Sequence, residues 1–319
     1  LKRRLLTLCE GTVILIIKDP DITTIGDMNL APARAQFEAP FFECNSLLRV
    51  DLKGCTKLAS VGTGAFGKCT SLTSVVLPDS LTLIGEAAFI ECTSLTSVVL
   101  PDSLTQLCEN AFQDCTSLTS IVLPDSLTQI GKGAFLKCSS LTSVVLPDSL
   151  TQLGVAAFGK CTSLTSMVLP DSLTQIGDFA FGHCTSLTSV VLPDSLTQMG
   201  KGAFGKCSSL MSVILPDSAE LGVDVFVECN ALVQKAFFAG FNSVEPYLRN
   251  RYNSVTLRKL VLRLLRKYNQ AVNYSDGTEA EKHASALALF PADNSGSLEV
   301  GLFLQKMNIS GGDGVIGLV

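Results

Sequence analysis

The chain has 319 residues, of which 47% are hydrophobic and 17% are charged, and its formal net charge is −5. This composition supplies enough apolar side chains for a folded core and excludes a disordered chain. No apolar run approaches the roughly 18 residues that a membrane-spanning helix needs, so no membrane span is expected.

The charges are unevenly distributed. Residues 44–229 contain 9 Lys and Arg against 16 Asp and Glu, whereas residues 230–319 contain 10 against 7. An acidic body argues against nucleic acid as its ligand. The chain starts with Leu, so LKRRLLTL is not interpreted as a targeting segment. Residues 1–43 are interpreted as an N-terminal cap or an incomplete first repeat.

Residues 44–229 repeat with a period of 23, as in CTSLTSMVLPDSLTQIGDFAF at 161–181. The last step is 22 residues long and the first, from Phe41, is 25. Each unit contributes one phenylalanine, followed three residues later by one cysteine. The phenylalanines are Phe66, Phe89, Phe112, Phe135, Phe158, Phe181, Phe204 and Phe226, and the cysteines are Cys69, Cys92, Cys115, Cys138, Cys161, Cys184, Cys207 and Cys229.

Each unit contains the pattern L-x-x-V-x-L, the spacing of a leucine-rich repeat strand. Alternation predicts that Val98 points into the core and that Val99 lies on the opposite face. The motif LPDS ends the strand, because proline lacks an N–H for the ladder and the Asp and Ser side chains can cap a turn. The next segment returns the chain and inserts its phenylalanine into a core that only neighbouring units can close.

The stretch GKGAFGK at 200–206 matches the glycine pattern of a phosphate-binding loop, followed by a lysine. However, it aligns with GEAAFIE, CENAFQD and GVAAFGK of sister units, most of which lack the pattern. A phosphate loop also needs an open helix N-terminus, whereas Phe204 must point inward here. The repeat therefore explains this motif without a nucleotide.

The repeated pattern L-x-x-[IV]-x-L-P-x-x-L-x-x-I-G-x-x-A-F-x-x-C resembles the BspA-like leucine-rich repeat family over residues 44–229. The resemblance implies an α/β repeat solenoid, a right-handed leucine-rich-repeat coil with short parallel strands, followed by a small helical C-terminal region. It also implies recognition or adhesion, often at cell surfaces, without catalysis, and it identifies no ligand.

Nine cysteines, Cys44 and the eight named above, form one column of the repeat. Neighbours in this column would lie about one strand spacing apart, nearer than most disulfides favour, and there is no C-x-x-C motif. Buried structural thiols are therefore predicted, and zinc is not. Unpaired thiols favour a reducing, cytoplasmic compartment, although the sequons at Asn273 and Asn308 point the other way.

Each LPDS motif also contributes to an aspartate column. Turn capping explains it, and an acidic ridge that attracts a divalent cation is the alternative. The column consists of Asp79, Asp102, Asp125, Asp148, Asp171, Asp194 and Asp217.

A stripe of serines beside a stripe of valines, expected on the concave face of the solenoid, suits an extended protein partner. The same stripe also satisfies β-propensity on a half-exposed strand. The candidate binding residues are Ser97, Val99, Ser120, Val122, Ser143, Val145, Ser166, Val168, Ser189 and Val191. Residues just before and after each phenylalanine vary most, so selectivity is expected there.

After residue 229 the repeat stops, and AFFAGFNSVEPYL is predicted to cover the open end of the core. Residues 255–268 have apolar side chains at helical spacing between basic ones. This basic amphipathic helix is expected to dock on the cap or the C-terminal module; contact with a membrane surface or a calmodulin-type partner remains open. Residues 230–319 are thus interpreted as a cap, this helix and an EF-hand-like region.

The segment ALALFPADNSGSLEVGLFLQKMN resembles an EF-hand, with Asp293, Ser295, Ser297 and Glu299 at ligand positions. Pro291 occupies position 1 and Leu302 occupies position 12, where calcium needs carboxylates. A relic used for packing, a weak Ca²⁺ site and a chance match all remain open.

A non-enzymatic protein-recognition or adhesion scaffold is the leading hypothesis, with no cofactor. The alternative is a calcium-responsive adaptor that uses the EF-hand-like segment. An enzyme is not expected, because His183 and His283 are the only histidines and no catalytic set can be placed around them.

Overall fold

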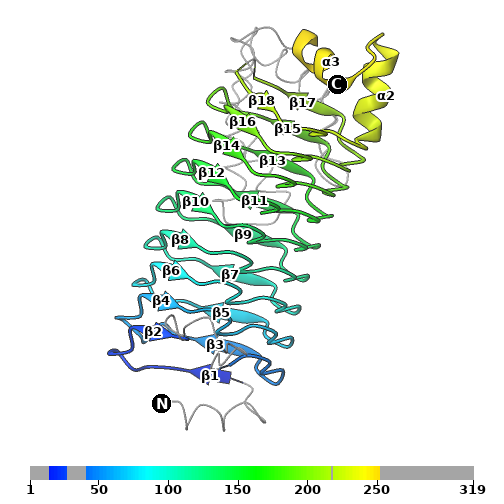
Figure 1. The fold of residues 1–319 in the computed structure, drawn as a ribbon. Coiled ribbons are helices and arrows are strands. Elements are labelled where there is room, and N and C mark those ends of the chain that lie inside the picture. Colours follow the sequence, from blue (N-terminus) through cyan, green and yellow to red (C-terminus); the bar gives the residue numbers. More distant parts are fainter. Residues whose placement is uncertain (1–13, 27–40, 217, 252–319) are drawn as a thin grey trace, which may run out of the picture.

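The computed structural model describes residues 14–26, 41–216 and 218–251, which form a rod of stacked turns (Figure 1). Each turn contributes one strand to each of two rows. The first row holds three-residue strands: β1 (Ile14–Ile16), β3 (Arg49–Asp51), β5 (Ser74–Val76), β7 (Ser97–Val99), β9 (Ser120–Val122), β11 (Ser143–Val145), β13 (Ser166–Val168), β15 (Ser189–Val191) and β17 (Ser212–Ile214).

The second row holds two-residue strands. They are β2 (Thr24–Ile25), β4 (Ser60–Val61), β6 (Leu83–Ile84), β8 (Gln106–Leu107), β10 (Gln129–Ile130), β12 (Gln152–Leu153), β14 (Gln175–Ile176), β16 (Gln198–Met199) and β18 (Glu220–Leu221). All strand pairs of the described chain are parallel, and equivalent residues of successive repeats lie side by side, as Val75 does with Val98. The predicted solenoid of short parallel strands is confirmed.

The two rows differ in continuity. In the described chain, the two-residue strands form a single nine-stranded sheet from β2 to β18. The three-residue strands form three sheets, β1-β3-β5-β7, β9-β11 and β13-β15-β17. The second row is therefore the unbroken spine of the rod, and the first row is interrupted after β7 and after β11.

A column of phenylalanine rings fills the core, as the repeat predicts. Successive rings stack at centroid distances of 5.1 to 5.9 Å with interplanar angles of at most 16°, from Phe41 through Phe226. The seven rings from Phe66 to Phe204 are fully buried. Val98 is also buried, and so are Leu104, Leu107 and Phe112 of the return segment. Burial of so many apolar side chains is the main stabilising term.

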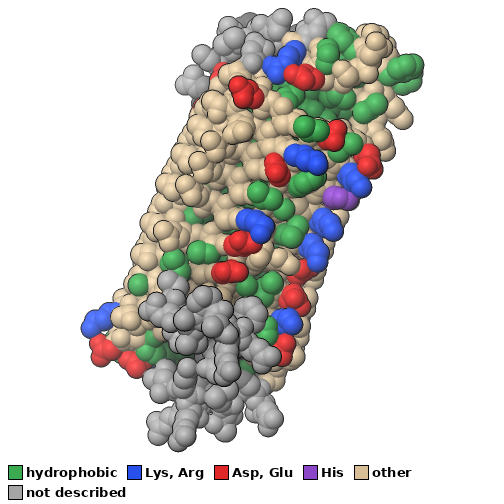
Figure 2. Space-filling view, in the orientation of Figure 1, with side chains coloured by type: hydrophobic (Ala, Val, Ile, Leu, Met, Phe, Trp, Pro, Cys, Tyr) green, Lys and Arg blue, Asp and Glu red, His purple; other side chains and the backbone are tan. Residues whose placement is uncertain are grey.

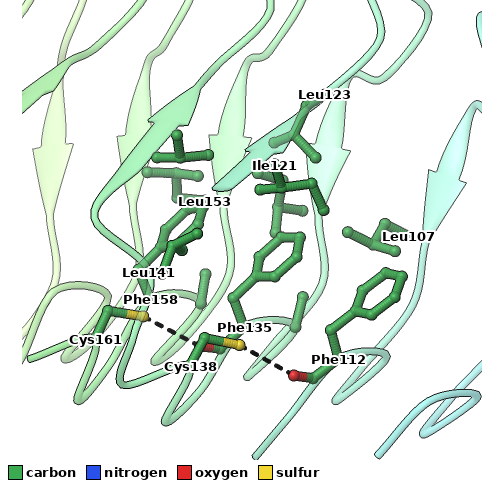
Figure 3. Close-up of a cluster of buried hydrophobic side chains, with 14 of the residues drawn as sticks. Leu107, Phe112, Ile121, Leu123, Phe135, Cys138, Leu141, Leu153, Phe158 and Cys161 are labelled. Atoms are coloured by element: carbon green, nitrogen blue, oxygen red, sulfur yellow. Dashed lines mark hydrogen bonds between the residues drawn. The ribbon is translucent and has the colours of Figure 1, made fainter. Parts of the chain in front are cut away.

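The cysteine column lies beside the phenylalanines and connects the turns. The Sγ–H of Cys138 donates to the carbonyl of Phe112 one turn earlier, and that of Cys161 donates to Phe135, each over 3.2 Å (Figure 3). The same bond recurs in every turn from Cys69 to Cys229. The thiol is a second donor to this carbonyl, which also accepts a backbone N–H within its own turn, as the carbonyl of Phe112 does from Cys115.

These thiols are free, as predicted, and burial raises the pKa of Cys138 and of Cys184 to about 12. Cys44, the first cysteine of the column, differs because it is disulfide-bonded. The prediction of a free thiol is therefore wrong at Cys44. Its physical basis, the short spacing between neighbours, applies only to pairs inside the column.

The LPDS serines form a second ladder between turns. The hydroxyl of Ser103 donates to the carbonyl of Leu81 over 2.6 Å, and that of Ser149 donates to the carbonyl of Leu127 over 2.8 Å. The serine was expected to cap its own turn. It bonds instead to the preceding turn, because equivalent turns lie one strand spacing apart.

Replacing Ser149 with alanine is expected to lower the free energy of unfolding by about 1 kcal/mol, because the carbonyl of Leu127 loses its donor in a half-buried position. Urea denaturation measures this loss. Ser143→Ala is the control, because Ser143 is exposed on β11 and its replacement should cost only a few tenths of a kcal/mol. Equal losses in the two variants would contradict the role of the ladder.

Two helices, α2 (Asn230–Phe238) and α3 (Val244–Arg251), close the C-terminal end of the stack. Leu232 and Ala236 of α2, with Tyr247 and Leu248 of α3, belong to the same core as the repeats. The guanidinium of Arg249 donates to the carbonyls of Pro216 and Ala219 in the last turn. The region AFFAGFNSVEPYL therefore packs on the last repeat, where a cap was predicted.

Candidate recognition surface

The outward face of the three-residue strands is the first candidate surface. In β7, Val98 is buried while Ser97 and Val99 face outward, so the predicted alternation is confirmed there. The exposed fraction of Val99 is 79% and that of Val122 is 43%. Since the strands are in register, serines lie beside serines and valines beside valines, as between β9 and β11.

This face is not equally accessible along the rod. Ser120, Ser143 and Ser166 are exposed, and Val145 and Val168 are half-buried. Ser189 and Val191 of β15, by contrast, are only 2% and 1% exposed. We define the outer stripe as the accessible part of the ten sequence-predicted residues: Ser97, Val99, Ser120, Val122, Ser143, Val145, Ser166 and Val168.

The second candidate surface is the loop edge, formed by the residues on either side of each core phenylalanine. Charged side chains collect along one long edge of the rod (Figure 2). The backbone here turns through the left-handed region twice in each repeat. The first position, two residues before Phe, includes Ala87, Ala156 and Phe179; the second, two residues after Phe, includes Lys68, Glu91, Asp114, Lys137, Lys160, His183, Lys206 and Glu228.

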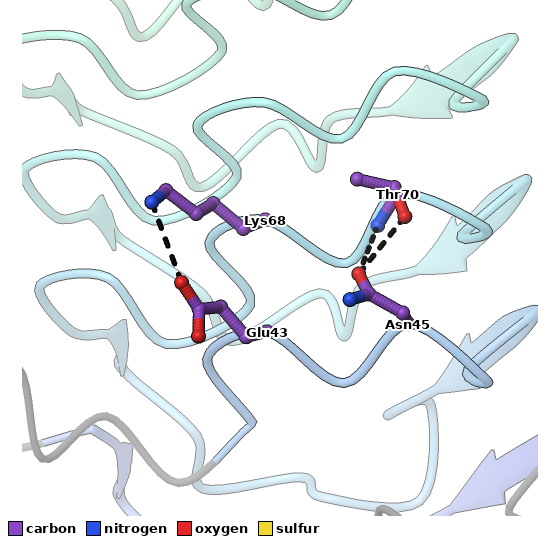
Figure 4. A network of polar contacts seen from close by, with 4 residues as sticks. All are labelled: Glu43, Asn45, Lys68 and Thr70. Carbon is purple, nitrogen blue, oxygen red and sulfur yellow. Dashed lines mark hydrogen bonds and ion pairs between the residues drawn. The ribbon is translucent and has the colours of Figure 1, made fainter.

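Ion pairs join neighbouring turns along the loop edge. Lys68 contacts Glu43 over 3.3 Å, and beside this pair the side-chain oxygen of Asn45 accepts hydrogen bonds from Thr70 (Figure 4). Further pairs join Lys137 to Asp114, Lys132 to Glu109 and Lys206 to Glu228. Exposed pairs of this kind stabilise little, so the edge is mainly a surface of variable charge.

His183 lies on the loop edge between two lysines. Partial burial, together with the ammonium groups of Lys206 and Lys160, lowers the pKa of His183, and Glu228 acts in the opposite direction. The imidazole is thus mostly neutral at pH 7. In the described chain, no three His, Cys, Asp or Glu side chains come together as a metal site requires.

The stretch 200–206 has the structure of a repeat edge. Gly202 adopts φ +57° and Phe204 is buried in the ring column. A Cβ at position 202 would lie 2.5 Å from a ring carbon of Phe179, so glycine leaves room for that ring. The glycine pattern therefore arises from turn geometry and close packing.

Several sequence-predicted features lie outside the described residues. They are the basic amphipathic segment 255–268, the EF-hand-like ligands Asp293, Ser295, Ser297 and Glu299, and His283. Asp217 of the aspartate column is also outside. Within the described residues, no helix has the length and apolar content to span a membrane.

Stacked 23-residue turns with parallel strands, a buried phenylalanine column and an exposed strand face define a leucine-rich repeat solenoid. The family "BspA type Leucine rich repeat region (6 copies)" matches residues 37–165 and 128–256. The chain therefore belongs to the BspA-type leucine-rich repeat family, as the resemblance indicated. No match was found among curated proteins.

One solved structure with a TM-score above 0.5 shows the same fold. A leucine-rich repeat protein from Bacteroides ovatus is 27% identical with a TM-score of 0.57, and the match covers 69% of this chain and 62% of that one. This chain thus spans less than two thirds of that protein. The Treponema pallidum leucine-rich repeat protein TpLRR is 26% identical with a TM-score of 0.40, covering 72% and 84%. A leucine-rich cell surface protein from Faecalibacterium prausnitzii is 21% identical with a TM-score of 0.29, covering 65% and 80%.

Proposed function

We propose that the chain is a non-enzymatic scaffold that binds a protein partner along the outer stripe. The observation that carries this proposal is the exposure of Val99 and Val122 on the outward face of successive turns. A row of accessible valines beside serine hydroxyls fits an extended polypeptide. Burial of apolar side chains and hydrogen bonds at regular intervals would both contribute to the binding free energy. Membership of the repeat family agrees with such a role.

The regularity of the surface argues against catalysis. A catalytic site needs a nucleophile, a base and an orienting group at one place, whereas the outer stripe repeats serine and valine in each turn. The buried thiols are also poor nucleophiles, because their raised pKa keeps them protonated near pH 7.

The double variant Val99→Asp/Val122→Asp tests this proposal. Each change places a charge in the middle of the stripe, so recovery of the bound protein from source cells should fall by about tenfold or more. Quantitative affinity capture with the full chain, read by mass spectrometry, measures the recovery. Far-UV circular dichroism verifies that both variants are folded.

The matched control is Gln106→Asp/Gln129→Asp, which adds the same charges to exposed positions of the opposite strand row. The control should retain the partner. Equal recovery with all three proteins would show that the outer stripe is not the binding surface.

A further inference from the structure

A run of basic side chains lies on the loop edge, although the repeats as a whole are acidic. At the position two residues after the core phenylalanine, successive turns carry Lys137, Lys160, His183 and Lys206, and all four side chains are exposed. We call these four residues the cationic row. Figure 2 shows lysine and histidine side chains in line along one long edge of the rod. Because the turns are one strand spacing apart, neighbouring members lie about 4.8 Å apart at the backbone.

The backbone holds the members of the cationic row in one orientation. Their φ angles lie between +59° and +63°. The N–H of each member donates to a carbonyl of the next turn, as Lys160 does to Gly182 and His183 does to Gly205, each over 2.7 Å. Since the backbone geometry repeats, the side chains leave successive turns in the same direction. The row is therefore a line of basic groups on a fixed frame.

The fold does not require a basic residue at this position. Glu91, Asp114 and Glu228 occupy it in other turns, with φ angles between +55° and +57°. The turn thus accepts either sign of charge, so turn geometry does not explain four basic residues in succession. Like charges one strand spacing apart repel each other. Such a row favours a ligand of opposite charge, which would offset this repulsion.

Carboxylates of the chain itself pair with the two ends of the cationic row. Lys137 contacts Asp114 over 3.1 Å, and Lys206 contacts Glu228 over 3.6 Å. Among the described residues, the two central members have no carboxylate within ion-pairing distance. Partial burial and the ammonium groups on both sides lower the pKa of His183, and Glu228 opposes this shift. The positive charge is thus least compensated at the centre of the row.

We propose that the cationic row binds an extended acidic peptide segment of a partner protein, whose carboxylates lie against Lys160 and His183. The row spans three strand spacings, roughly 14 Å, and an extended peptide presents side chains on one face about every 6.8 Å, so about three acidic side chains cover the row. The ion pairs at both ends of the row already use carboxylates in this way. The row shares no residue with the outer stripe, so its test is independent of the binding proposed there.

A charge-reversal variant tests this proposal. Lys160→Glu/Lys206→Glu changes two members of the row, and Glu91 and Glu228 demonstrate that the same turn accepts glutamate. The probe is a short dye-labelled peptide of alternating Glu and Ala, and fluorescence anisotropy at low salt measures its binding to the full chain. The unmodified chain should bind this peptide saturably, and the variant should bind it about tenfold or more weakly. The same peptide with Gln in place of Glu should not bind.

The matched control is Lys53→Glu/Lys57→Glu, which makes the same change in net charge at two exposed lysines near the N-terminal end of the rod. Each variant also loses one exposed ion pair, Lys206 with Glu228 or Lys57 with Asp21. The control should keep its affinity for the peptide within about twofold, because distant exposed charges are screened. Circular dichroism verifies that both variants are folded.

Absence of saturable binding by the unmodified chain would overturn the proposal, and so would equal losses in the row variant and the control. Tighter binding of a sulfated oligosaccharide, also lost in the row variant, would assign the row to a polysaccharide and overturn the peptide assignment. Should the double reversal fail to fold, Lys160→Gln removes one central charge, and it should still weaken peptide binding about threefold or more. Unchanged affinity in that variant would likewise contradict the proposal.

Discussion

Replacing Phe135 with alanine is expected to lower the free energy of unfolding by about 3–5 kcal/mol. Phe135 is fully buried and stacks between Phe112 and Phe158 at centroid distances of 5.6 and 5.2 Å. Alanine would leave a cavity that the parallel strands on either side cannot close, because the ladders fix the spacing of the turns. Urea denaturation followed by circular dichroism measures the change.

Phe179→Ala is the matched control for this variant. Phe179 is 44% exposed on the loop edge and has φ +52°. Alanine already occupies the equivalent position, with φ +53°, at Ala87 and Ala156. The control should therefore cost no more than about 1 kcal/mol. A loss as large as that of Phe135→Ala would show that the ring column does not dominate stability.

Stability is expected to fall steeply as the pH rises above about 9. Burial raises the pKa of Cys69, Cys138 and Cys184 to about 12, from an ordinary value of 9.0. The folded chain keeps these protons while the unfolded chain releases them, so the stabilisation is complete below pH 9 and is lost between pH 9 and 12. Each such thiol contributes a slope of about 1.4 kcal/mol per pH unit.

The variant Cys138→Ala isolates one of these thiols. At pH 7 it should be less stable than the unmodified chain, because it lacks the bond to Phe112 and some packing. Between pH 9 and 12 the difference should shrink by about 1.4 kcal/mol per pH unit. Urea denaturation at a series of pH values measures both slopes. Parallel slopes would mean that the Cys138 thiolate is not excluded from the folded state.

Much of the architecture could be predicted from the sequence, because the same pattern of apolar residues recurs in successive units. The period placed the ring column, and the L-x-x-V-x-L pattern predicted that Val98 lies inside and Val99 outside. The loop edge was harder. Non-glycine residues as different as Ala87, Phe179 and Lys160 adopt positive φ, so residue type gives no signal, and the constraint is the turn imposed by neighbouring repeats.

Accessibility of the candidate site could not be predicted from the repeat. The local sequence of β15 nearly equals that of β7, so nothing within the unit distinguishes buried Val191 from exposed Val99. The difference depends on long-range packing, which a local pattern does not encode. The disulfide state of Cys44 has the same origin, since the column pattern describes only its own members.

The bonds from each cysteine and LPDS serine to the preceding turn give the rod a direction and a modular length. Through these two side chains, every unit donates toward the N-terminal side and accepts from the C-terminal side, with the same atoms each time. If one complete 23-residue unit is duplicated or deleted, the turns that become neighbours form the same hydrogen bonds, because they supply the same donors and acceptors. The length of such a protein can change during evolution in whole turns, by unequal recombination within the gene, while both end structures stay as they are.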